Sequence, residues 1–410
     1  MRCVILFIDS IEEAAYDNKI KHAIGILILS EFLVFLGISL VIPVMPFLKN
    51  ELHLTALDMG IMNSLFAFAQ FVVSPIVGRT SDRIGRKPVL LVGLLLFMVS
   101  EYLFALTNHL WLFDISRIIG GISAAMVGPT AMAMAADITS KRDRAKVIGY
   151  LSAAFSGGLI LGPGIGGMLA NISYKTPFWV AGTLGLLSTL ALLRFLPSED
   201  DLITEVPKAS AEPEVNLRGH LWSLLKGPAL ILFVLILISS FGLQGFESIY
   251  SLYVNEVFNF SLSNIALVLT LNGMISLVFQ VVLFDRLVRW FSETRVIRYC
   301  FFFALAGTVW IILAHTKVEV IIATLFVFTA IDIVRPAITT LLTKITDKNQ
   351  GLINGLNMSL TSIGNVIGPI MSGSLLDLNY HYPYLVVSGF LALSFGLTYF
   401  IRLGKQSLAN

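Results

Sequence analysis

Long runs of apolar residues, separated by short polar connections, fill most of the chain. Twelve of these runs are long enough to cross about 30 Å of hydrocarbon as helices. They lack the alternation in twos that marks the strands of a membrane barrel. The pattern therefore predicts an all-α membrane protein with twelve transmembrane helices. The expected spans are 22–46, 58–78, 88–107, 111–136, 146–170, 177–196, 228–253, 263–284, 296–314, 319–342, 352–375 and 383–402.

The longest polar stretch divides this pattern into two sets of six spans. It runs from Pro197 to Lys226, and its many charges and prolines are typical of a flexible linker. Five parts are therefore expected along the chain. They are a cytoplasmic N-terminal extension (1–21), a first six-helix half (22–196), a cytoplasmic linker (197–227), a second six-helix half (228–403) and a cytoplasmic tail (404–410).

Composition excludes a soluble globular protein and several kinds of partner. Hydrophobic residues make up 56% of the chain and charged residues only 13%, whereas soluble domains carry about 25% charged residues. The net charge of +2 is too small to indicate a nucleic-acid partner. The two cysteines, Cys3 and Cys300, lie in unrelated segments, so we expect neither a disulfide framework nor a metal cluster.

The positions of the 28 basic residues predict how the chain crosses the membrane. With the N-terminus inside, 23 of them lie in the termini, in the even-numbered connections and in the helix ends that border these parts. The outer connections hold Lys49, Lys175 and Lys317, while Arg117 and Arg335 fall within spans. By the positive-inside rule, both termini are expected to be cytoplasmic.

The two halves repeat each other in sequence. "GLILGPGIGG" at 158–167 matches "GNVIGPIMSG" at 364–373 with an offset of 206 residues, and "DRIGR" at 82–86 matches "DRLVR" at 285–289 with an offset of 203. Two six-helix halves in the same orientation indicate a parallel duplication, the kind whose halves rock about a site near the membrane midplane.

Several motifs resemble those of the major facilitator superfamily, and specifically of its twelve-helix drug–proton antiporters. "GRTSDRIGRK" at 78–87 fits the signature of the connection between helices 2 and 3, and "RIIGGISAA" at 117–125 fits the helix-4 signature. "GLILGPGIGG" fits the antiporter signature of helix 5. "GFESIYSLY" at 245–253 and "DIVRPAIT" at 332–339 are most similar to the NorA-type quinolone and multidrug efflux pumps. The resemblance implies the major facilitator fold.

The charged motif after the second span is interpreted as a conformational latch. Its basic side chains can bind carboxylates or helix-end carbonyls of neighbouring helices, and its glycines permit a close approach and a sharp turn. A contact made in one conformation and broken in the other biases a rocking equilibrium. The alternative is that the charges serve positive-inside topology alone. The latch comprises Gly78, Asp82, Arg83, Gly85, Arg86 and Lys87, with Asp285 and Arg286 in its shorter copy.

The helix-5 motif combines a face of small residues with a proline. The glycines, spaced in threes and fours, allow another helix to approach closely, and the proline removes a backbone hydrogen bond and bends the helix. We expect this face to form a seam between the two halves, although small-residue faces are common packing in any helix bundle. Its residues are Gly158, Gly162, Pro163, Gly166 and Gly167.

Charged side chains within the spans are the candidates for transport chemistry, because a lone carboxylate in hydrocarbon is costly. Glu247 lies in the seventh span and Asp332 in the tenth, with Arg335 three residues further on the same helical face. The resemblance implies that Glu247 and Asp332 are protonation sites, with Arg335 part of the same group. The alternative for Asp332 is a permanent ion pair with Arg335.

Two charges in the first half have less defined roles. Glu31, in the first span, is a candidate for contact with cationic drugs or for a second proton site. Its alternative is a hydrated position near the inner interface. Arg117 resembles the arginine that the helix-4 signature assigns to proton transfer, and its alternative is a structural counter-ion for one of the acids.

The resemblance also implies a substrate cavity rich in aromatic and apolar residues. Such a wall tolerates many amphipathic ligands, because burial and stacking do not demand one shape. The expected substrate-facing residues are Phe35, Ile38, Gln70, Gln244, Glu247, Phe328, Asp332 and Asn357.

The expected function is a proton-coupled antiporter that exports hydrophobic, often cationic or zwitterionic drugs across the bacterial cell membrane. The alternatives are an exporter of the same fold for a narrower solute, such as a sugar, a polyamine or a metal chelate, and a membrane sensor that transports nothing. The sequence shows no nucleophile–base set and no phosphate-cradling motif, so we expect no enzyme, no cofactor and no direct use of ATP. The protein is expected to be monomeric.

Overall fold

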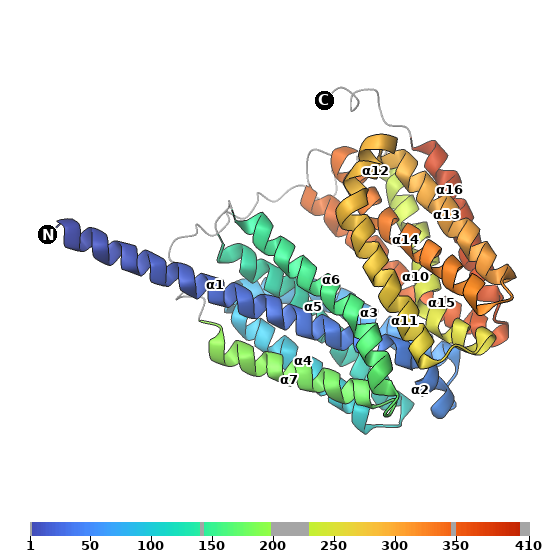
Figure 1. The fold of residues 1–410 in the computed structure, drawn as a ribbon, viewed down its shortest axis with the longest axis horizontal. Coiled ribbons are helices and arrows are strands. Elements are labelled where there is room, and N and C mark those ends of the chain that lie inside the picture. Colours follow the sequence, from blue (N-terminus) through green and yellow to red (C-terminus); the bar gives the residue numbers. More distant parts are fainter. Residues whose placement is uncertain (1, 140–142, 198–228, 346–349, 402–410) are drawn as a thin grey trace. The chain divides into compact units, whose positions relative to one another are not determined.

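The computed structural model describes residues 2–139, 143–197, 229–345 and 350–401. Within these residues every regular element is a helix (Figure 1). The predicted all-helical class is confirmed. The expected linker from residue 198 onward, the tail 404–410 and the side chains of residues 1–18 lie outside what is described.

Each expected span overlaps a helix, but the first, expected to continue to residue 46, ends as α1 at Leu40. Nine helices of the described ranges are long and apolar enough to cross a membrane, whereas α11, α14 and α15 are not among the nine. The first part of the chain contains α1 (Arg2–Leu40), α2 (Met45–Glu51), α3 (Ala56–Ile84), α4 (Arg86–Leu106), α5 (Leu110–Asp137), α6 (Arg144–Ala170) and α7 (Thr176–Phe195). The rest contains α10 (Ala229–Phe258), α11 (Leu262–Val278), α12 (Phe284–Phe291), α13 (Glu293–Leu313), α14 (Lys317–Ile345), α15 (Gln350–Leu378) and α16 (Tyr382–Leu397), with short 3-10 helices at Ile42–Val44 and Thr398–Phe400.

The first compact unit comprises residues Met1–Ile42 and Ala69–Ser210. Here α1 packs against α6 and α7, and α4 packs against α5 and α7 (Figure 1). Apolar side chains from these helices form a continuous buried core that includes Leu27, Leu94, Phe97, Met134 and Leu151.

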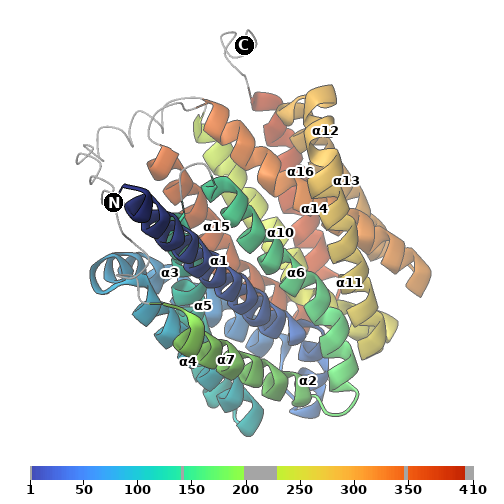
Figure 2. The same cartoon turned by 60° about the vertical axis from the view of Figure 1, so that its left-hand side comes forward.

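The second compact unit comprises Pro43–Phe68 and Ala211–Asn410. Its α10 packs against α15 and α16, and α13 packs against α14 and α16 (Figure 2). The pairing of α10 with α15 repeats the pairing of α1 with α6. In both pairs the glycine motif makes the close contact: Gly158 lies against the α1 backbone at Leu36, and Gly364 lies against the α10 backbone at Ser240.

The segment 43–68 belongs to the second unit through specific contacts with α10 and α15. Gly60 lies directly against the backbone of Pro369, where no side chain would fit. The Asp377 carboxylate accepts hydrogen bonds from the backbone N–H groups of Ala56 (2.9 Å) and Leu57 (2.8 Å). A carboxylate at the first turn of a helix is stabilising, because it satisfies free N–H groups and complements the helix dipole.

The eighth span is less regular than expected. We predicted one helix over 263–284, but α11 ends at Val278 and a π-helical segment, Phe279–Leu283, joins it to α12. One extra residue per turn widens the helix at this point, and such bulges often occur at functional sites.

Candidate functional site

An acidic and basic cluster joins α10, α11 and α14 in the second unit. Arg335 of α14 donates to Glu247 of α10 across 2.8 Å, and these side chains are 48% and 24% exposed. Asp332, one turn before Arg335, accepts a hydrogen bond from the Ser276 hydroxyl of α11. The cluster thus holds two carboxyl groups and one guanidinium within three helices.

Arg335 therefore has a different partner from the one suggested by its spacing. The i+3 separation favoured a pair with Asp332, whereas the structure pairs Arg335 with Glu247, which lies 88 residues away. The long arginine side chain reaches the neighbouring helix, and Asp332 is held by Ser276. Neither Ser276 nor the Glu247–Arg335 contact carried a signal in the sequence.

Glu31 is buried in the first unit, with only 1% of its surface exposed. Neither of its carboxylate oxygens has a hydrogen-bond partner among the described residues. Gly128 of α5 lies beside it, and the ring of Phe35 packs on Phe155 of α6 with a centroid distance of 4.2 Å. This burial does not fit a hydrated position near the interface.

A buried ion pair joins α4 and α5. Arg117 donates to Glu101 across 3.2 Å, and these side chains are 10% and 4% exposed. The guanidinium also lies 4.7 Å from the ring centroid of Phe104. Glu101 carried one signal in the sequence, an acid within an apolar span.

The expected substrate-facing residues occupy several environments. Phe328 is buried against Phe246 and Tyr250 in an aromatic cluster of the second unit. The Asn357 amide donates to the Thr339 hydroxyl across 3.4 Å. Among the others, Gln244 packs on Gly368, Ile38 packs on the core of the first unit, and Gln70 is half-buried on α3.

The charged motif at the α3–α4 junction binds other parts of the first unit. Arg86 bridges Asp82 (2.5 Å) and Asp137 at the end of α5 (3.0 Å). Lys87 donates to the backbone carbonyl of Leu196, just beyond α7, across 2.5 Å. Arg86 thus contacts carboxylates and Lys87 a helix-end carbonyl within the unit, whereas the role of the motif as a latch stays a prediction.

The glycines of this motif do not behave alike. Gly85 has a φ of 100°, a conformation that favours glycine and turns the chain sharply between α3 and α4. Gly78 has no atom within 4 Å of where a side chain would begin, so the expected close approach is not observed there. Arg83 is exposed at the end of α3, and Arg286 is exposed on α12; the Asp285 side chain lies outside the described residues.

The helix-5 glycine face has its partner within the first unit. Gly158, Gly162 and Gly166 of α6 lie against α1, and the hydroxyl of Ser39 in α1 donates to the Gly158 carbonyl across 2.9 Å. The expected seam between halves is therefore not the contact that these glycines make here. Pro163 lies inside α6, and both it and Gly167 are buried.

Comparisons with known proteins give this geometry a context. A family model described as Major Facilitator Superfamily matches residues 27–343. Multidrug resistance protein 1 of Bacillus subtilis (strain 168) is 42% identical over 382 residues, covering 93% of this chain and 96% of that protein. Quinolone resistance protein NorA of Staphylococcus aureus (strain COL) is 36% identical over 366 residues, covering 89% and 93%.

A solved structure shows the same fold at low sequence identity. A variant of the nucleoside transporter NupG superposes with a TM-score of 0.80 at 11% identity, covering 93% of this chain and all of that one.

In the described part of this chain, no cluster of three or more His, Cys, Asp or Glu side chains is arranged to hold a metal ion.

Proposed function

Because the chain belongs to the Major Facilitator Superfamily, we propose that it is a proton-coupled antiporter exporting hydrophobic, often cationic or zwitterionic drugs by alternating access. The names of its relatives, multidrug resistance protein and quinolone resistance protein, support this substrate class. No ATP hydrolysis and no cofactor take part. The monomer is the working unit, and it lies in the bacterial cell membrane with both termini in the cytoplasm.

The observation that carries this proposal is the cluster of Glu247, Arg335 and Asp332. Two ionised carboxylates and one guanidinium leave one negative charge in an apolar bundle. Such a charge is costly, and either a proton or a cationic drug neutralises it. The proton and the drug therefore compete for this negative charge. Each can leave only when the other replaces it, and such an exchange is antiport.

The first unit supplies a second set of groups to the same cycle. Glu31, buried beside Phe35, offers a counter-charge for cationic drugs or a second proton site. Arg117 takes part in proton transfer through its pair with Glu101. The proposed substrate-facing residues are Phe35, Ile38 and Gln70 in the first unit, and Gln244, Phe328 and Asn357 in the second.

The test is dye transport in energised inverted vesicles that contain the full-length protein. Ethidium uptake into such vesicles corresponds to export from the cell. We expect transport to collapse when a protonophore dissipates the gradient, and to continue without ATP while the gradient is maintained. Transport that needs ATP and proceeds without a gradient would refute the proposal.

Asp82→Asn should slow turnover while leaving folding and drug binding largely intact. Asp82 is 62% exposed and contacts Arg86, so its loss removes one side of a conformational contact and no ligand. Arg86 keeps Asp137 as a partner, and so the fold is preserved. The measured transport rate should fall, while the affinity for ethidium stays close to the wild-type value. A variant that transports at the wild-type rate would leave these charges with a role in topology alone.

A further inference from the structure

An apolar groove lies on the second unit, away from the acid cluster. It has a volume of about 660 Å³ and almost no polar lining, and it is formed by α11, the π-helical segment, α12, α13 and α14. Both views show α11, α13 and α14 side by side (Figures 1 and 2). Its walls include Phe279, Phe291, Cys300, Phe303, Phe326 and Thr329.

The groove is open at the surface of the second unit. Several of its lining side chains are half exposed, among them Ile322 (51%), Tyr299 (46%) and Phe326 (45%). In a bilayer these side chains meet lipid tails. Its apolar lining suits a hydrocarbon chain, and its volume falls within the range of about 300–1,000 Å³ for ligand sites.

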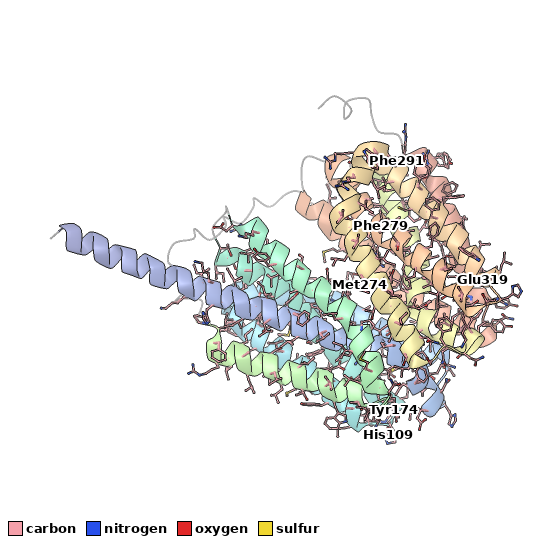
Figure 3. The ribbon with its side chains drawn as sticks, in the orientation of Figure 1. His109, Tyr174, Met274, Phe279, Phe291 and Glu319 are labelled. Carbon is pink, nitrogen blue, oxygen red and sulfur yellow. The ribbon has the colours of Figure 1, made fainter. Side chains whose placement is uncertain are left out.

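Basic residues adjoin some of the lining residues in the sequence. Figure 3 shows Phe291 near the turn that links α12 to α13 and Phe279 farther along the wall. Arg286 and Arg295, both exposed, immediately precede the lining residues Leu287 and Val296. Over residues 284–298 the chain carries four arginines against one aspartate and one glutamate. Trp290, 71% exposed, stands among them, as is typical of the membrane interface.

The lining has no carboxylate, so a drug cation would find no counter-charge there. An amphipathic anion finds both an apolar channel for its tail and guanidinium groups for its head. We propose that this groove binds an anionic phospholipid, with one acyl chain between α11, α13 and α14 and its phosphate at Arg286 and Arg295. This site does not depend on which solute the protein exports.

Native mass spectrometry of the full-length, delipidated protein tests the proposal. Dioleoyl phosphatidylglycerol and dioleoyl phosphatidylcholine, which share their acyl chains, are titrated separately. We expect preferential retention of phosphatidylglycerol. Arg286→Gln and Arg295→Gln should each weaken it about fivefold, with little effect on phosphatidylcholine. Arg194→Gln, an exposed arginine at the end of α7 in the other unit, is the matched control and should change nothing.

A groove-filling variant tests the position of the acyl chain. Thr329→Trp should remove most phosphatidylglycerol binding while leaving the arginines in place. If this variant does not fold, Ile322→Trp fills the groove from a position that is already exposed. Equal retention of the two lipids, or unchanged retention in the filled groove, would overturn the proposal. Displacement of the lipid by ethidium, with transport lost in the filled variant, would make the groove a drug site instead.

Discussion

Asp332→Asn should reduce uphill ethidium transport to the background of vesicles without the protein, while folded yield stays close to wild type. The neutral side chain mimics a permanently protonated acid, so the proton gradient no longer drives exchange. Folding is preserved because Arg335 keeps its partner Glu247. Downhill exchange of a drug that needs no anionic partner should persist. Uphill and downhill transport in the same vesicles provide the measurement.

Glu247→Gln provides the contrast, because it removes the partner of Arg335. Uphill transport should be lost here too, and the folded yield should fall, since Arg335 then loses its ion-pair partner Glu247. Arg335 is 48% exposed, so this loss is smaller than for a fully buried charge. Glu247→Gln combined with Arg335→Leu should restore the yield.

The matched control is Glu51→Gln, which neutralises an exposed acid at the end of α2 and should transport normally. If Asp332→Asn instead expresses poorly and Arg335→Leu rescues it, the static pair of Asp332 with Arg335 is the correct account. Full uphill transport by Asp332→Asn would remove Asp332 from the proton path and leave Glu247 and Glu31 as the candidates.

Glu101→Gln should lower the stability of the first unit severely. The change leaves Arg117 buried without its ion-pair partner, which costs about 3–5 kcal/mol in comparable buried pairs. The cation–π contact with Phe104 is present in the wild type as well, so it offsets none of this loss. A large drop in the thermal unfolding midpoint of the purified protein is therefore expected.

The double variant Glu101→Gln with Arg117→Met separates structure from proton transfer. Removing both charges should recover folding, because an apolar side chain of similar length fills the space. If the double variant folds but lacks uphill transport, Arg117 belongs to the proton path. Uphill transport at the wild-type rate would make the pair purely structural. Arg194→Gln, which removes an exposed arginine, should match wild type in both stability and transport.

Local patterns predicted the fold well, because span length and small-residue spacing are properties of single helices. The helix ends agree with the expected spans to within a few residues at most positions, and Gly158 and Gly364 do make equivalent close contacts. The partner of the α6 face was not predictable, since a glycine face admits any helix. Here α1 occupies it, in place of the seam between halves that we expected.

The site could be predicted less completely from the sequence, because its contacts join different helices. The i+3 rule compares residues on one helix only. It therefore could not show that Glu247, on another helix, competes with Asp332 as the partner of Arg335. Glu101 gave only a weak signal for a similar reason, because the sequence does not show that its partner Arg117 lies on the neighbouring helix. Ser276 resembles any other serine of a membrane helix until its contact with Asp332 is seen.

Consecutive residues on two helices separate the acid cluster from the apolar groove. On α11, Ile275 lines the groove and Ser276 donates to Asp332; on α14, Ile333 lines the groove directly after Asp332. The same helix pair therefore carries a carboxyl group of the acid cluster and part of the wall of the apolar groove. If protonation shifts α11 against α14, it also changes the affinity of the groove for its occupant. By thermodynamic linkage, the occupant then changes the proton affinity by the same factor. The composition of the bilayer then becomes a thermodynamic variable of transport in its own right, alongside pH.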